Sequence, residues 1–119
     1  MSDPVPRRAL VVEDDPELSH LIARLLRRSA IESAVVGRLG AAREALAAGA
    51  FDALVIDRSL PDGDGAAFIS ELRAQGSALP AVLMSGAPVA APDGLTRFLQ
   101  KPFSIDALPL LLATMLAPR

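Results

Sequence analysis

The chain has 119 residues, a formal net charge of −2 and no cysteine, with eleven arginines and a single lysine. This length suits one domain with one hydrophobic core, which we expect to span residues 1–119 with a core from about 8 to 116. The mild charge, without a basic stripe, argues against nucleic acid as a main partner. The absence of cysteine excludes disulfides, thiolate nucleophiles and cysteine-bound metals, so any catalytic or metal site must use oxygen and nitrogen.

Short apolar runs alternate with longer amphipathic ones along the chain. The pattern predicts strands over 9–12, 33–36, 53–56, 81–84 and 97–100, and helices over 16–29, 40–48 and about 66–75. Asp15 before Pro16 is typical of an N-cap followed by proline at the first helical position. Ser104 is expected to cap a last helix that carries Ile105 and Met115.

The middle strands are apolar at every position, which indicates burial on both faces. Strands of this kind are usually parallel, with helices outside. Right-handed crossovers between five such strands predict a three-layer, doubly wound α/β sandwich with its site at the carboxyl ends of the strands.

Two segments depart from this regular pattern. Residues 86–94 hold two prolines and two glycines with weak amphipathicity, which favours a loop. Pro109 predicts either a kink in the last helix or a later start for it.

Polar side chains follow four of the five strands: Glu13 and Asp14, then Asp57, Ser85 and Lys101. Unit charges about 4 Å apart interact by roughly 4 kcal/mol at an effective dielectric near 20, so three gathered carboxylates need a positive charge among them. An all-oxygen set at a partly open position suits Mg²⁺. The ammonium of Lys101 supplies a second positive charge.

Residues 11–14, 55–65, 83–86 and 98–103 together resemble the receiver domains of two-component response regulators, and the resemblance covers nearly the whole chain. It implies a flavodoxin-like sheet in the strand order 2-1-3-4-5. It also implies that Asp57 accepts a phosphoryl group from a phosphohistidine. Asp14 would bind Mg²⁺, or Mn²⁺ as an alternative, directly and Glu13 through water, while Asp57 and the backbone carbonyl of Ser59 complete the protein ligands.

The resemblance also implies roles for the residues of the later strands. Ser85 would donate a hydrogen bond to a phosphoryl oxygen, and Lys101 would pair with another. Phe98 matches the aromatic switch position of the family, with plain packing as the other interpretation. The peptide bond before Pro102 is typically cis in this family.

Only 16 positions separate Ser85 from Lys101, about one and a half helical turns fewer than is usual in the family. We therefore expect a shortened or missing fourth helix. The family's usual dimer and output surface would be altered, which favours a monomer.

We interpret the chain as a stand-alone phosphoacceptor receiver that signals through altered protein contacts and is not an enzyme with an external substrate. The expected phosphodonor is a histidine kinase or a histidine phosphotransferase that docks near the first helix. That helix carries His20 on its polar face, which is either part of the docking surface or simply solvated. No apolar run approaches the roughly 18–20 residues of a membrane span and no signal peptide is visible, so we expect a cytoplasmic protein without membrane contact.

Three alternatives remain open. The first is the C-terminal receiver of a hybrid histidine kinase. The second is a phosphatase of the haloacid dehalogenase type, which needs a second acid where this chain has Ser59. The third is a flavodoxin-like cofactor binder, which needs a hydroxyl- and glycine-rich loop where this chain has three acids, residues 13–15.

Overall fold

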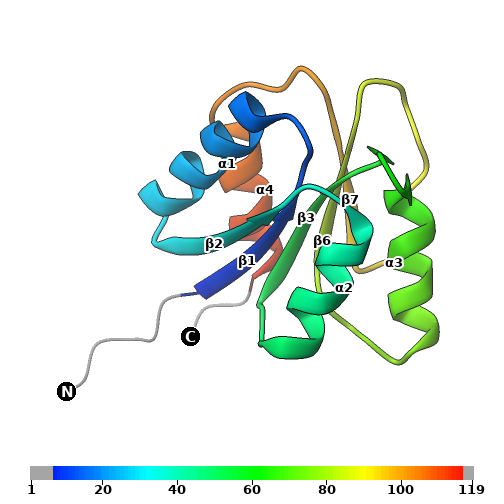
Figure 1. Ribbon diagram of the computed structural model, residues 1–119. Coiled ribbons are helices and arrows are strands. Elements are labelled where there is room, and N and C mark those ends of the chain that lie inside the picture. Colours follow the sequence, from blue (N-terminus) through cyan, green and yellow to red (C-terminus); the bar gives the residue numbers. More distant parts are fainter. Residues whose placement is uncertain (1–6, 117–119) are drawn as a thin grey trace.

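The computed structural model describes residues 7–116 and contains one five-stranded parallel sheet in the order β2-β1-β3-β6-β7 (Figure 1). Its strands are β1 (Arg7–Val12), β2 (Ile31–Val36), β3 (Ala53–Asp57), β6 (Ala81–Ser85) and β7 (Thr96–Gln100). Numbered along the chain, these five strands have the order 2-1-3-4-5. The predicted doubly wound α/β topology is confirmed.

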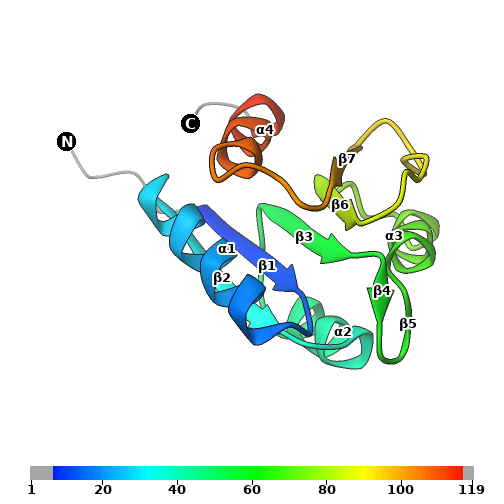
Figure 2. The same ribbon diagram turned by 90° about the horizontal axis from the view of Figure 1, so that it is seen from above.

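Four helices cover the two faces of this sheet. Helices α1 (Pro16–Arg28) and α4 (Ala107–Met115) pack on one face, and α2 (Leu39–Ala48) and α3 (Gly65–Ala74) pack on the other (Figure 2). Strands β3 and β6 are buried at every position because helices lie on both sides of them. Within residues 7–116, no helix is long and apolar enough to cross a membrane.

Alternate residues of the central strands enter different cores. Leu10, Leu54 and Leu83 belong to the core beneath α2 and α3, whereas Val11 and Val55 belong to the core beneath α1 and α4. Each such side chain, fully buried, contributes about 1.5–3 kcal/mol relative to exposure. Two apolar cores therefore hold the sheet rigidly, and the carboxyl ends of its strands have fixed relative positions.

Helix α1 begins as the sequence predicts. The Asp15 side chain accepts a hydrogen bond from the backbone N–H of Glu17 at 3.0 Å, and Pro16 is the first helical residue. Proline is tolerated there because its missing N–H would have no partner within the helix. The segment that bears the acids after β1 is thus joined directly to a well-capped helix.

The predicted start of the last helix is partly wrong. Ser104 is not its N-cap, since α4 begins at Ala107 after Asp106, and Ile105 lies outside the helix with 57% of its surface exposed. Pro109 is the third residue of α4, within the first turn, where no hydrogen bond is lost. Of the two expectations for this proline, the later start is therefore confirmed.

The expectation of a missing fourth helix is also confirmed. The described residues between β6 and β7 contain no helix, and Val89 from this connection packs on the core beneath α2 and α3. An ion pair between Arg73 Nε and Asp93 Oδ2, at 2.9 Å, ties the connection to α3. We define residues 86–95 as the β6–β7 loop.

The turn-rich segment after β3 holds regular structure that the sequence analysis did not predict. Strands β4 (Ser59–Leu60) and β5 (Gly63–Asp64) form a short antiparallel hairpin. Asp64 then caps α3, because its side chain accepts hydrogen bonds from the backbone N–H groups of Ala66 and Ala67. We define residues 58–64 as the β3–α3 hairpin.

Candidate functional site

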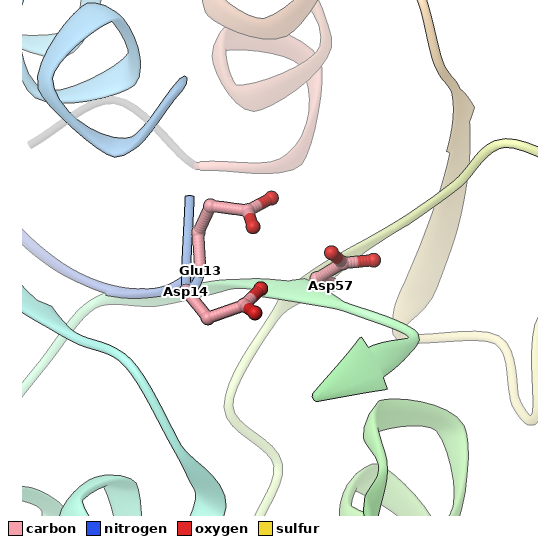
Figure 3. A group of neighbouring side chains, drawn as sticks. All are labelled: Glu13, Asp14 and Asp57. Atoms are coloured by element: carbon pink, nitrogen blue, oxygen red, sulfur yellow. The ribbon is translucent and has the colours of Figure 1, made fainter. Parts of the chain in front are cut away.

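Three carboxylates meet at the carboxyl edge of the sheet (Figure 3). Glu13 and Asp14 follow β1, and Asp57 ends the neighbouring strand β3. Each offers an oxygen atom, and these atoms all lie within 4.8 Å of one another. Glu13 and Asp57 are 3% and 8% exposed, whereas Asp14 is exposed to solvent. The topology thus brings together residues that are more than forty positions apart in the sequence.

Lys101, which follows β7, joins the two buried carboxylates. Its Nζ donates hydrogen bonds to Glu13 Oε1 at 2.7 Å and to Asp57 Oδ2 at 2.9 Å. The lysine side chain is 24% exposed, so its charge interacts with both acids in a partly desolvated site. The peptide bond between Lys101 and Pro102 is cis. The single lysine of the chain is therefore the cation of this site.

The pKa values of this cluster reflect its burial and its ion pairs. Desolvation raises the pKa of Glu13 above its ordinary value, and this effect outweighs the hydrogen bonds from Lys101 and from the Asp15 backbone. Desolvation acts to lower the pKa of Lys101, but its hydrogen bonds to Glu13 and Asp57 prevail and raise that pKa. Lys101 therefore stays charged at neutral pH, and the cluster favours binding of positive charge.

Ser85 and Ser59 lie next to Asp57. Ser85 directly follows Met84, which pairs with Asp57 across the sheet, and its carbonyl accepts a hydrogen bond from the Lys101 N–H at 2.8 Å. The Ser85 hydroxyl oxygen accepts from the backbone N–H of Ala87 at 3.2 Å. The backbone N–H of Ser59 donates to Asp57 Oδ1 at 3.3 Å. Both residues are thus placed by backbone contacts at the edge that holds the acids.

Phe98 lies in β7 and is half-buried, outside the acidic cluster. It pairs with Leu83, while Ser85 pairs with Gln100, so alternation along the two strands places Ser85 and Phe98 on the same face of the sheet. His20 is exposed on α1 and lies outside the group of acids as well.

Gly65 is needed where the β3–α3 hairpin returns to the sheet. A Cβ atom there would overlap the backbone carbonyl oxygen of Asp57. The Gly65 N–H donates to the Arg58 carbonyl at 2.7 Å, and the Arg58 N–H donates to the Met84 carbonyl at 2.8 Å. These contacts fix the chain on both sides of the hairpin, and with it the backbone that carries Asp57.

Asp62, at the tip of this hairpin, has a role that the sequence analysis missed. Its Oδ1 and Oδ2 accept hydrogen bonds from the backbone N–H groups of Leu39 and Gly40, at 2.7 and 2.9 Å. Arg38, the N-cap residue of α2, provides no side-chain cap of its own. Arginine is a poor N-cap residue, so Arg38 before α2 is a signal in the sequence that an acceptor from elsewhere caps this helix.

The donor set of the cluster fits a small divalent cation. Carboxylate oxygens are the ligands that Mg²⁺ prefers, and one exposed acid beside two buried ones leaves a solvent-facing side for water ligands. Mn²⁺ is coordinated by the same kind of donor. No histidine or cysteine contributes to the cluster, so a zinc site of the usual ligand composition does not match it.

Comparison with known sequences agrees with this arrangement. The family model of the response regulator receiver domain matches residues 9–113. The chain is 39% identical over 114 residues to the transcriptional activator protein PfeR of Pseudomonas aeruginosa, which covers 91% of this chain and 37% of PfeR. It is 39% identical over 111 residues to the transcriptional regulatory protein TcrA of Mycobacterium tuberculosis, covering 85% and 42%. The chain therefore spans less than half the length of these relatives.

Solved structures agree as well. A sensor protein from Polaromonas sp. JS666 is similar with a TM-score of 0.81 and 30% identity, over 94% of this chain and 96% of that one. A CheY-like response regulator receiver domain from Methylobacillus flagellatus is similar with a TM-score of 0.81 and 28% identity, over 93% and 99%. With the matched family, the sheet order and the acidic edge in agreement, the chain belongs to the response regulator receiver domains, the signalling domains of two-component systems.

Proposed function

We propose that Asp57 accepts a phosphoryl group from a phosphohistidine on a partner protein. The observation that carries this proposal is the position of the Asp57 carboxylate, buried at a strand end between the Lys101 ammonium and the acids that follow β1. In such a transfer the carboxylate is itself the nucleophile, so no separate general base is needed.

The transfer is a displacement at phosphorus. An oxygen of Asp57 forms the new O–P bond while the N–P bond of the donor breaks, and the imidazole nitrogen leaves with the electron pair and takes up a proton. Lys101 sits 2.9 Å from Asp57 and can stabilise the charge of the transferred oxygens. The Ser85 hydroxyl oxygen accepts from the Ala87 N–H, which leaves its O–H able to donate to a phosphoryl oxygen.

Mg²⁺ would be held by Asp14, Asp57 and the backbone carbonyl of Ser59, with Glu13 acting through water. When bound, it would neutralise charge on the phosphoryl oxygens and the carboxylates. The clustered oxygens of the three acids support this assignment. Glu13 is held by Lys101 and by the Asp15 N–H, which leaves Asp14 as the more accessible ligand.

A phosphoryl group adds close to two negative charges and new acceptor oxygens, which would attract Ser85 and Lys101. Movement of Ser85 would open space on the face that it shares with Phe98. We assign Phe98 the role of a switch on this basis, so that phosphorylation alters the surface near β7 and thereby the contacts with a downstream protein.

We place the docking site of the phosphodonor beside α1. A hollow of about 490 Å³ is lined by Leu18 and Leu21 of α1 together with Lys101, Pro102 and Phe103. Its lining combines these apolar residues and the lysine with the acids Asp15 and Glu17, which suits the amphipathic surface of a helix of a histidine kinase or phosphotransferase. Because such kinases use ATP, we place the reaction in the cytoplasm. The missing fourth helix alters the family's usual dimer surface, so we propose that the domain acts as a monomer.

A receiver attached to a sensor kinase is the second candidate. The similarity to the Polaromonas sensor protein, at 30% identity over nearly the whole of both chains, favours it. Phosphotransfer rates would distinguish the two candidates. A receiver from a hybrid kinase is expected to prefer one kinase module and to pass its phosphoryl group on to a histidine phosphotransferase.

The assignment of Asp57 can be tested by mass spectrometry of the intact protein after incubation with a small phosphodonor and Mg²⁺. We expect a mass gain of one phosphoryl group in the wild type and no gain in Asp57→Asn. Asp106→Asn is the matched control, since that exposed acid makes no side-chain cap. A mass gain that persists in Asp57→Asn would refute the assignment.

A further inference from the structure

The connection between Asp62 and α2 links two parts of the metal site proposed above. Asp62 lies in the two-residue turn of the β3–α3 hairpin, between β4 and β5. Its two carboxylate oxygens hold separate backbone N–H groups at the start of α2, at 2.7 and 2.9 Å. A carboxylate at a helix N-terminus is stabilised by the N–H groups and by the helix dipole. The tip of the hairpin is therefore held by α2, whereas its base is held beside β6 through Arg58.

A second contact strengthens the same anchor. Gly63 has a φ of +154°, and a Cβ atom there would lie 2.8 Å from Cδ1 of Leu39, the first residue of α2. The hairpin thus packs its backbone closely on that side chain while the neighbouring carboxylate binds the helix N–H groups. The hydrogen bonds from the Leu39 and Gly40 N–H groups also lower the pKa of Asp62, because they favour its ionised form.

The start of α2 is in turn attached to the acids after β1. The Glu13 N–H donates to the Val36 carbonyl at 3.0 Å. A Cβ atom at Gly37 would lie 3.8 Å from the Cα atom of Asp14. Residues 36–40 therefore contact both the segment that carries Asp14 and the hairpin that carries Ser59.

These contacts close a ring around the site. It runs from the acids after β1 through residues 36–40 to Asp62, then along the hairpin to Ser59 and back to Asp57, which accepts the Ser59 N–H. The Asp62 hydrogen bonds are the link of this ring that joins the hairpin to α2, and the one to Gly40 is exposed to solvent.

We propose that Asp62 is a positioning residue for the metal site, because its hold on α2 fixes the Ser59 backbone relative to Asp14. The inference rests on the proposed Mg²⁺ function, in which those two groups are ligands. Without the anchor, the hairpin keeps its base at Gly65 and its Leu60 contact with the core, but its tip is released. The metal ligands would then be present but less well arranged, which weakens binding of the metal.

The experiment is a Mg²⁺ titration by isothermal calorimetry, since the chain has no tryptophan or tyrosine to report binding. We expect Asp62→Ala to weaken Mg²⁺ binding by about tenfold. Asp62→Asn should weaken it less, because an amide oxygen still accepts one N–H. Ala47→Gly is the control, since it destabilises α2 at an exposed position without touching the hairpin.

A second readout is amide hydrogen exchange at Ser59, which should accelerate in Asp62→Ala and not in Ala47→Gly. Equal Mg²⁺ affinity in the wild type and Asp62→Ala, or an equal loss in Ala47→Gly, would overturn the inference. If Asp62→Ala does not fold, the same criteria apply to Asp62→Asn. A wild type that binds Mg²⁺ without accepting a phosphoryl group would instead refute the proposed function and leave this test valid.

Discussion

Two of the connections that leave the carboxyl edge of the sheet beside Asp57, those after β3 and after β6, are held in different ways. After β3, the β3–α3 hairpin is held at its tip by Asp62 and at its base by Asp64, and Gly65 passes against the Asp57 backbone. After β6, the β6–β7 loop has no regular structure and is tied down near its far end by Asp93. The β3–α3 hairpin, which carries the proposed metal ligand Ser59, is thus held at both ends, whereas the β6–β7 loop is irregular.

The difference shows which of the two connections must keep its length and shape for the site to form. Ser85 lies within the ladder, where its carbonyl accepts the Lys101 N–H and its strand pairs with β7. The sheet therefore positions Ser85 and Lys101 whatever the length of the loop between them. By contrast, Ser59 lies outside the five-stranded sheet, and its position depends on its contact with Asp57 and on the hairpin that Asp62 ties to α2.

The largest difference is expected when a glycine in each of the two connections is replaced by alanine. Gly65→Ala should lower the free energy of unfolding by about 3 kcal/mol, because its Cβ overlaps the Asp57 carbonyl oxygen and the buried backbone must move. Gly86→Ala, in the β6–β7 loop, should be close to wild type, since no atom lies within 4 Å of the added Cβ. Urea unfolding measures both. Equal stability of the two variants would contradict the view that the hairpin is the constrained segment.

The next effect concerns Lys101, which the sheet holds independently of both connections. Lys101→Met leaves the carboxylates of Glu13 and Asp57 without their shared hydrogen-bond donor, and we expect a loss of about 2 kcal/mol in unfolding free energy without added metal. Mg²⁺ should then raise the melting temperature of Lys101→Met more than that of the wild type, because it supplies the missing positive charge.

The control for this lysine variant is Arg97→Met, at an exposed position in β7, the strand that precedes Lys101. It should melt close to the wild type and respond to Mg²⁺ as the wild type does. Thermal melts at several Mg²⁺ concentrations measure both effects, and a smaller Mg²⁺ response in Lys101→Met would argue against a shared site.

The smallest effect is expected at the anchor of the β6–β7 loop. Burial acts to raise the pKa of Asp93, but hydrogen bonds from Arg73, Leu95 and Thr96 prevail and lower it. Its ionised form therefore stabilises the fold above the ordinary pKa of 3.8, and this contribution is lost as the pH falls through the lower folded value. Asp93→Asn should cost about 1 kcal/mol at neutral pH, and the difference from the wild type should shrink below pH 3.8.

Unfolding at a series of pH values checks this prediction. Glu71→Gln removes the comparable ion pair with Arg43, which is more exposed than that of Asp93, and should cost less. A difference between wild type and Asp93→Asn that stays constant down to low pH would show that charge is not what anchors the loop.

Much of the fold followed from local patterns. The apolar runs at β3 and β6 required burial on both faces, and the Asp15–Pro16 pair marked the start of α1. The start of α4 could not be located in this way. Ser104 is a favourable cap in isolation, but the helix begins three residues later, which leaves Pro109 within its first turn.

The sequence by itself determined the strands, their parallel arrangement and the residues at their carboxyl ends, because burial and helix capping act over a few neighbouring positions. Only the tertiary structure decided that Lys101 joins Glu13 to Asp57 and that Asp62 caps α2. Such contacts join segments tens of residues apart, and their geometry depends on how the sheet and helices pack together. Local patterns mark candidates, such as the lysine after the last strand and the poor cap at Arg38, but they do not specify which residues meet.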